Sequence, residues 1–148
     1  KTIMRRTFLF FFWVFLGIQA IRVDYDIPES VPENDLIALM NPPEEVANIL
    51  TKSCYDCHSH KTEYPWYSQV APFSWWTTHH VAEARMHFNF SKWNEMSQKD
   101  LETFAEEAEY EINEDEMPLP PYTWIHSGAD LTEGEKEIMI AWLNDVGY

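Results

Sequence analysis

The sequence has few basic residues, a single pair of cysteines and no arrangement typical of a hydrolase. Ten lysines and arginines face 25 acids, which gives a formal net charge of −15. This balance argues against nucleic-acid binding and against broad adsorption to anionic lipid. No Ser/His/Asp set or carboxylate pair has a convincing catalytic spacing, so we do not expect an enzyme. No apolar–polar alternation is long enough to indicate a strand, and an all-α fold is predicted.

Both cysteines fall in one five-residue motif, which reads Cys54-Tyr55-Asp56-Cys57-His58. This is the C-x-x-C-H pattern of covalent c-type haem attachment. Two thiols at this spacing can reach the two vinyl groups on one porphyrin edge, while the adjacent imidazole binds the iron from one face. We therefore predict one haem c, attached through Cys54 and Cys57, with His58 as the proximal iron ligand.

Three other interpretations of the two cysteines were weighed. A redox dithiol normally sits at the start of a helix in a thioredoxin-like βαβ unit, whereas the residues before Cys54 predict a helix that ends there. A zinc site could recruit His58 or His60, but the sequence has no second cysteine pair. An incidental disulfide is the third alternative. Haem attachment accounts for the whole motif and is favoured.

The amino-terminal residues are typical of an export signal. Lys1, Arg5 and Arg6 precede an apolar run over 8–18. The run is shorter than the roughly 20 residues of a perpendicular membrane helix. We expect residues 1–23 to be an uncleaved, single-pass signal-anchor helix in a bacterial inner membrane, with the haem domain in the periplasm. This compartment suits the motif, because bacterial c-type haem is attached outside the cytoplasm.

Two further segments follow the expected anchor. Residues 24–43 are rich in proline and acids and predict a linker, although the apolar cluster 36–40 could dock onto the domain. Residues 44–148 predict a small cytochrome c-like helical domain around one haem. Its expected helices begin near Glu44, near Ser74, after Ser97 and at Thr132, the last two with capping-box signals. The first of these helices should deliver Cys54 to the haem.

The second axial ligand of the iron is predicted to be Met117. This residue enters the proline-rich stretch 117–122, where fixed φ angles can present its sulfur outside a helix. A thioether suits haem iron, and Met/His ligation raises the reduction potential. An open or water-bound position is the alternative, as are four histidines: His79, His80, His87 and His126. A minor alternative places a separate metal on the helix face shared by His79, Glu83 and His87.

Several segments together resemble a known family: 54–59, Tyr64-Pro65-Trp66-Tyr67, 71–75, 89–93 and Met117-Pro118. They are similar to the haem-binding domain of exported bacterial cytochromes common in Bacteroidetes. The likeness covers roughly residues 44–148 and implies a haem cofactor and an exported location. More distantly, the attachment helix, the Met-Pro loop and the closing helix resemble class I cytochromes c, which supports Met117 as a ligand. The dense aromatic content between His58 and Met117 departs from the simplest such cytochromes.

We therefore expect a membrane-anchored monohaem cytochrome that carries single electrons. Arg85, Trp66 and Trp75 are predicted to contact the haem, with buried indole N–H groups or the guanidinium at its propionates. The acidic surface should dock on a basic patch of a redox partner protein. The chain could also be a subunit of a respiratory membrane complex. Alternatives from other classes are a haem enzyme or gas sensor with an open sixth position, and a structural haem-bearing subunit.

Overall fold

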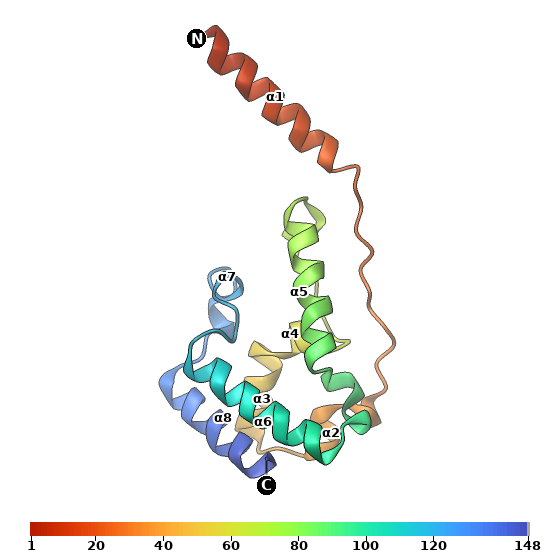
Figure 1. Ribbon diagram of the computed structural model, residues 1–148, viewed down its shortest axis with the longest axis vertical. Helices are drawn as coiled ribbons and strands as arrows, with labels where there is room; N and C mark the ends of the chain where they lie inside the picture. Colours follow the sequence, from red (N-terminus) through yellow and green to blue (C-terminus); the bar gives the residue numbers. More distant parts are fainter. Residues whose placement is uncertain (148) are drawn as a thin grey trace.

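The computed structural model describes residues 1–147, and every regular element among them is helical, which confirms the all-α prediction (Figure 1). Four helices exceed eight residues within the domain, and shorter α and 3₁₀ turns connect them. In chain order the elements are α1 (Thr2–Ile18), η1 (Pro32–Asn34), α2 (Leu36–Met40), α3 (Glu44–Ser53), α4 (Tyr55–His58), η2 (Trp66–Gln69), α5 (Phe73–His87), η3 (Phe90–Glu95), α6 (Gln98–Asn113), α7 (Pro120–Thr123), η4 (Ser127–Ala129) and α8 (Glu133–Val146).

The long helices of the domain begin at the residues that the sequence indicates. Acids occupy the first turn of α3, directly after Pro43, where they face the positive end of the helix. Complete capping boxes start α6 at Ser97 and α8 at Thr132. In each box the hydroxyl accepts from a backbone N–H three residues on, which satisfies a donor that the helix leaves free. These local signals fix the register in which the apolar faces meet.

The core lies where α6 and α8 pack together and α3 packs against α8. Phe104 of α6 is its aromatic centre. The ring of Phe104 meets Trp93 at 5.0 Å and Phe90 at 5.9 Å, both edge to face. Leu50 and Leu143 belong to the aliphatic part of the same core and are almost completely buried. Burial of such side chains supplies the largest favourable term in folding.

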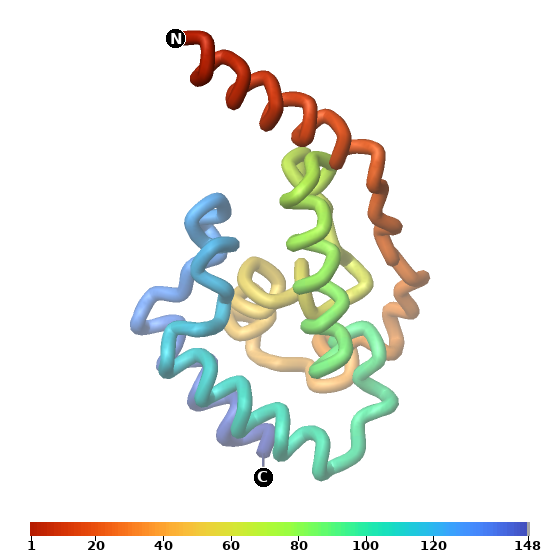
Figure 2. The backbone as a smooth tube through the Cα atoms, turned by 45° about the horizontal axis from the view of Figure 1, so that its top comes forward, coloured from red at the N-terminus to blue at the C-terminus, as the bar shows by residue number. Residues whose placement is uncertain are grey.

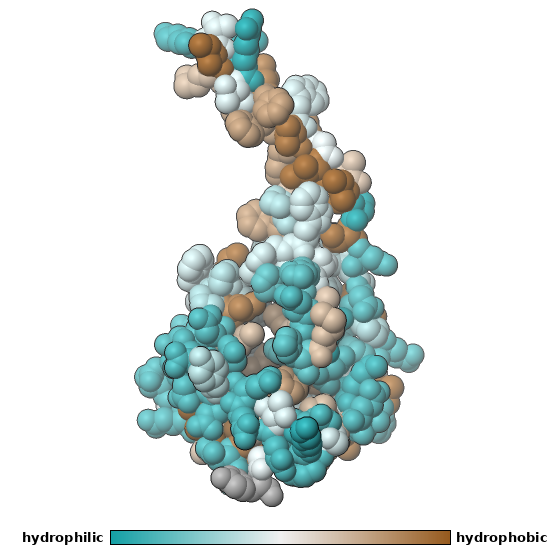
Figure 3. Space-filling view, viewed as in Figure 1, coloured by the Kyte–Doolittle hydropathy of each residue, from teal (hydrophilic) through white to brown (hydrophobic). Residues whose placement is uncertain are grey.

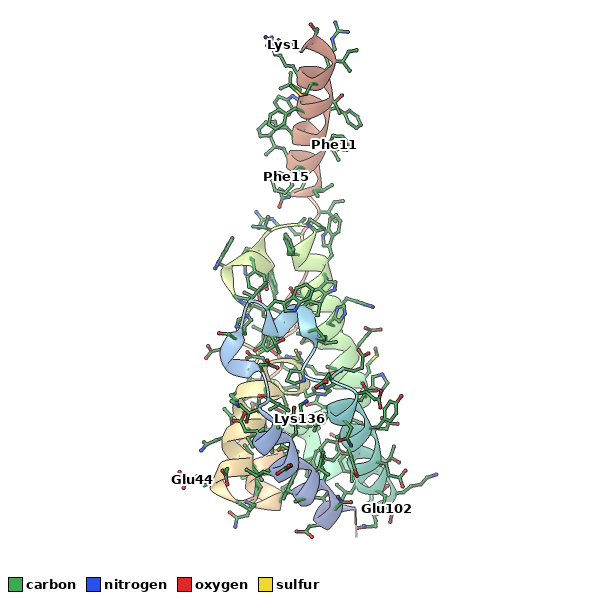
Figure 4. The ribbon with its side chains drawn as sticks, turned by 90° about the vertical axis from the view of Figure 1, so that its left-hand side faces the viewer. Lys1, Phe11, Phe15, Glu44, Glu102 and Lys136 are labelled. Atoms are coloured by element: carbon green, nitrogen blue, oxygen red, sulfur yellow. The ribbon has the colours of Figure 1, made fainter. Side chains whose placement is uncertain are left out.

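Helix α1 projects away from the domain, as the ribbon and the tube both show (Figures 1 and 2). None of its side chains is buried, and Phe11 and Phe15 stand out from the helix in Figure 4. Among residues 1–147, no helix is long and apolar enough to cross a membrane.

Residues 24–43 run along the domain and contact it at several points. Leu36, the first residue of α2, is fully buried in the core. Asp35 is also buried, and its carboxylate accepts from the Tyr55 hydroxyl at 2.6 Å and lies 2.8 Å from Lys61 Nζ. Arg85 Nη1 donates to the carbonyl of Asp26 at 2.6 Å. The segment expected as a linker therefore packs directly against the attachment motif.

Candidate functional site

The cysteine motif occupies the junction between α3 and α4. Cys54 ends α3 with non-helical backbone angles, φ −121° and ψ −39°, and also begins α4. Its carbonyl accepts from the backbone N–H of Cys57 at 3.2 Å and of His58 at 3.0 Å. This short turn holds the two thiols and the imidazole within five residues of one hydrogen-bonded unit. Both thiols are free and half-buried.

The two thiols are poor nucleophiles in this environment. Burial and the neighbouring Cys57 raise the pKa of Cys54 to about 12. Burial, followed by the nearby Asp56 charge, raises the pKa of Cys57 to about 11. A redox dithiol needs the opposite, an attacking cysteine whose pKa is lowered toward neutrality. The electrostatics therefore disfavour the dithiol interpretation.

His58 is oriented by a backbone carbonyl at the end of α5. Its Nδ1 lies 3.1 Å from the oxygen of Phe88, and because a carbonyl only accepts, Nδ1 carries the proton. The ring also stacks on Phe90 with centroids 5.3 Å apart. Burial lowers the pKa of His58, which keeps the imidazole neutral. Nε2 is left as the nitrogen with a free lone pair, the arrangement that metal-binding histidines commonly show.

The surroundings of His60 bear on the zinc alternative. No group of three or more His, Cys, Asp or Glu side chains in residues 1–147 is placed to hold a metal ion. The zinc alternative also needs a free ring nitrogen on His60. That ring is engaged on both sides, by the Glu29 carbonyl at 3.2 Å and by Asn89 Nδ2 at 2.9 Å. One histidine beside two thiols fits haem better than zinc.

A cavity of about 460 Å³, part of it open to solvent, adjoins Cys57. One wall comes from α5 and another from the stretch around α7, and the face drawn in Figure 3 is visibly hollowed. Its lining includes Cys57, Tyr67, His80, Leu119, Tyr122 and His126.

Two hydrogen bonds join the α7 side of this cavity to the attachment motif and to η2. Tyr122 donates to Asp56 Oδ2 at 2.7 Å, and the Tyr67 hydroxyl lies 2.7 Å from His126 Nε2. The rings of Tyr122 and His126 stack with centroids 4.4 Å apart. Asp56 stands between the two cysteines in sequence. The segment after Met117 is thus fixed beside the thiols.

The two predicted axial ligands, His58 and Met117, differ in how the structure positions them. His58 has a fixed orientation, whereas Met117 is half-exposed just beyond α6 and is not among the described residues that line the cavity. Leu119, two residues later, does line it. Of the four rival histidines, His80 and His126 border the cavity. His79 pairs with Glu83 at 3.2 Å on the outer face of α5, and His87 is exposed.

The other three predicted haem contacts differ in where the structure places them. Arg85 donates to the carbonyl of Ser59 at 2.8 Å and to the Thr62 hydroxyl at 2.8 Å, so its guanidinium braces the chain after the motif. Trp75 is half-buried, and its indole N–H donates to the Ile21 carbonyl at 3.3 Å. Trp66, expected as a buried indole, is 80% exposed.

Sequence reasoning missed the tyrosines of the site and the carbonyl of Phe88. Tyr67 and Tyr122 belong to segments noted for other reasons, and only the folded chain brings their hydroxyls to His126 and Asp56. A backbone acceptor such as Phe88 leaves no side-chain signal.

Comparison with known protein families gives one match. A family model described as a haem-binding domain matches residues 13–145, which is most of the chain. The match includes the cysteine motif, Met117 and the segment 24–43. Comparison with curated proteins and with solved structures finds no match.

Proposed function

Because the chain belongs to the haem-binding domain family, we propose that it is a monohaem c-type cytochrome that carries single electrons. The observation that carries this proposal is the neutral His58, held through Nδ1 by the Phe88 carbonyl beside two free thiols. A haem enzyme or gas sensor would share these features. It would differ at the second axial position, which the experiment below examines.

Each residue of the motif has a distinct task. Cys54 and Cys57 would hold the haem through two thioethers, which prevents its loss. His58 would bind the iron through Nε2, and the Phe88 carbonyl would fix the ring and increase its basicity. The bound haem supplies a one-electron couple whose potential depends on axial ligands, burial and nearby hydrogen bonds.

The protein around the motif would set that potential. The His58 ring is half-buried and stacks on Phe90, an apolar contact that would limit water near the iron. We assign Met117 as the second axial ligand, because its loop is attached to the motif through Tyr122 and Asp56. Polarisable sulfur opposite histidine gives a higher potential than two nitrogen ligands.

We place the protein on the outer side of the cytoplasmic membrane, where c-type haem is attached. The basic and apolar residues of α1 support export. Its redox partner would carry a basic patch, because the outer face of α6 is almost wholly acidic (Glu102, Glu106, Glu107, Glu109, Glu111). Such complementarity speeds the encounter of two redox proteins. Membership of a respiratory complex would use the same surface.

The test is spectroscopy of the full chain, made in cells with the c-type maturation machinery. Acid–acetone extraction removes haem that is not covalently bound. Haem that stays with the wild-type chain after extraction, but not with the Cys54→Ala/Cys57→Ala variant, supports covalent attachment. A low-spin reduced spectrum that carbon monoxide leaves unchanged supports the carrier. A high-spin spectrum that shifts with carbon monoxide contradicts it and favours an enzyme or sensor. Electron exchange too slow for respiration would favour a structural subunit.

A further inference from the structure

One end of the domain carries large apolar side chains that point into solvent. Trp66 and Trp124 are each 80% exposed, Ile125 is 60% exposed and Phe73 is 56% exposed. We call these four residues the aromatic end. Single exposed apolar residues are ordinary, but several at one end of a domain form the kind of patch that marks an interaction surface.

Contacts within the domain hold these residues at the same end as α1. The Tyr67–His126 hydrogen bond joins the neighbours of Trp66 to those of Trp124. The Gln19 side chain exchanges two hydrogen bonds with the backbone of Ala71, at 2.9 and 3.0 Å, which attaches the base of α1 beside Phe73. Figure 1 shows α7 and the start of α5 directed toward the end from which α1 projects.

The charge distribution distinguishes this end from the rest of the molecule. Charged residues make up 24% of the chain, yet residues 64–78 and 117–129 contain no Asp, Glu, Lys or Arg. These two stretches supply the aromatic end. Asp56 and Glu63 line the adjoining cavity, whereas Figure 4 shows Glu44 and Glu102 at the opposite extremity from Lys1. A basic protein partner would be drawn to the acidic end, not to this one.

The uncharged character of the aromatic end fits a lipid bilayer. Tryptophan prefers the boundary between headgroups and acyl chains, where its ring is buried and its N–H stays near water. Helix α1 adjoins this end and exposes apolar side chains around its whole circumference, among them Phe8, Phe10 and Trp13. Gln19 holds the base of α1 beside this end, so one bilayer would cover both surfaces.

We propose that the aromatic end rests in the headgroup region of a phospholipid bilayer, as a second contact besides the one expected of α1. This contact fixes the orientation of the domain, with α6 and its acids facing away from the lipid. Apolar and aromatic contacts hold the aromatic end to the bilayer. Binding therefore needs no anionic lipid, and its affinity does not fall as the salt concentration rises. The proposal does not depend on haem or on electron transfer.

The test is flotation of the full-length holoprotein with phosphatidylcholine vesicles at low and high salt. The variant is Trp66→Ala/Trp124→Ala, and the matched control is Tyr110→Ala, an aromatic that is 62% exposed on α6. We expect the double variant to bind roughly tenfold more weakly, from the apolar area that two indoles bury. The control should bind like the wild type, with little effect of salt.

Hydrogen exchange on the vesicle-bound protein separates this contact from that of α1. We expect vesicles to protect 65–69 and 122–126 in the wild type but not in the double variant, while α1 is protected in both. Equal binding of the two proteins, or protection confined to α1, would overturn the proposal. Absence of binding to vesicles would also overturn it and would indicate a protein partner instead. Spectra of the haem report separately on the proposed function.

Discussion

Tyr122 donates a hydrogen bond of 2.7 Å to Asp56, and this contact ties the segment 117–126 to the cysteine motif. Burial and the Asp56 carboxylate both raise the pKa of Tyr122, so its hydroxyl keeps the proton that it donates. Asp56 lies between Cys54 and Cys57, whereas Tyr122 comes five residues after Met117. The bond therefore links the two parts of the chain that are expected to hold the haem.

Replacing Tyr122 by Phe should make the segment 117–126 more mobile without creating a cavity in the core. Loss of one such hydrogen bond should lower the free energy of unfolding by about 1–2 kcal/mol. Amide hydrogen exchange should accelerate over 117–126 and stay unchanged over α6. Tyr110→Phe is the control, because Tyr110 is exposed on α6. Equal exchange in the two variants would mean that the bond does not hold the segment.

The identity of the second axial ligand can be checked by Met117→Ala. The weak far-red sulfur-to-iron band of the oxidised protein should disappear and the reduction potential should fall, because a thioether ligand favours the reduced state. Met86→Ala is the matched control, since Met86 is 78% exposed near the end of α5. Retention of the band in Met117→Ala would transfer the assignment to another residue, with His80 and His126 tested next.

Asp35→Ala should be strongly destabilising. The carboxylate accepts from the Tyr55 hydroxyl at 2.6 Å and from the Ile37 N–H at 3.1 Å, and its removal leaves the buried Tyr55 hydroxyl without this acceptor. We expect a loss of about 2–3 kcal/mol in urea unfolding. The exposed Glu33→Ala, two residues earlier, should change little. Similar values for the two would show that 24–43 contributes nothing to the stability of the domain.

Stability should fall in acid partly through Glu135. The Lys52 hydrogen bond, followed by the Thr132 backbone N–H, lowers the pKa of Glu135 in the folded state. A folded pKa below the unfolded one means that the unfolded chain binds more protons in this range. The contribution is therefore complete above the unfolded value of about 4.3 and is lost as pH falls through the folded pKa.

The measurement is the urea midpoint of the wild type and of Glu135→Gln between about pH 3 and pH 7. The difference between the two proteins should be largest near neutrality and should shrink as the pH falls. Glu137→Gln, at an exposed position of the same helix, is the control. A difference that stays constant across this range would contradict a role for the Glu135 charge.

Local signals in the sequence predicted the long helices but not the short ones. Capping boxes at Ser97 and Thr132 and the stripe at Val46, Ile49 and Leu50 are contained in single helices and can be recognised without the fold. Helix α7 and the 3₁₀ turns are too short for periodicity to show. The packing of Leu36 could be suspected only from an apolar cluster between prolines, because burial depends on what the rest of the chain offers.

The functional site likewise combines a motif that the sequence identifies with contacts that only the folded chain creates. The Cys54–His58 motif identifies its own chemistry, because covalent attachment requires these groups within one turn. The bonds of Asp56 to Tyr122 and of Tyr67 to His126 cross 66 and 59 residues of chain and are not encoded locally. The exposure of Trp66 was likewise not readable, since composition says that tryptophan is present but not which way it faces.

The acceptor that orients His58 belongs to the main chain of Phe88, not to a side chain. No substitution at position 88, other than one that displaces the end of α5, can delete this oxygen. Substitutions around His58 can therefore change its packing and solvent access. They leave the backbone acceptor in place, and with it the tautomer in which Nδ1 carries the proton. A scan of side chains alone would overlook the group that governs the ligand.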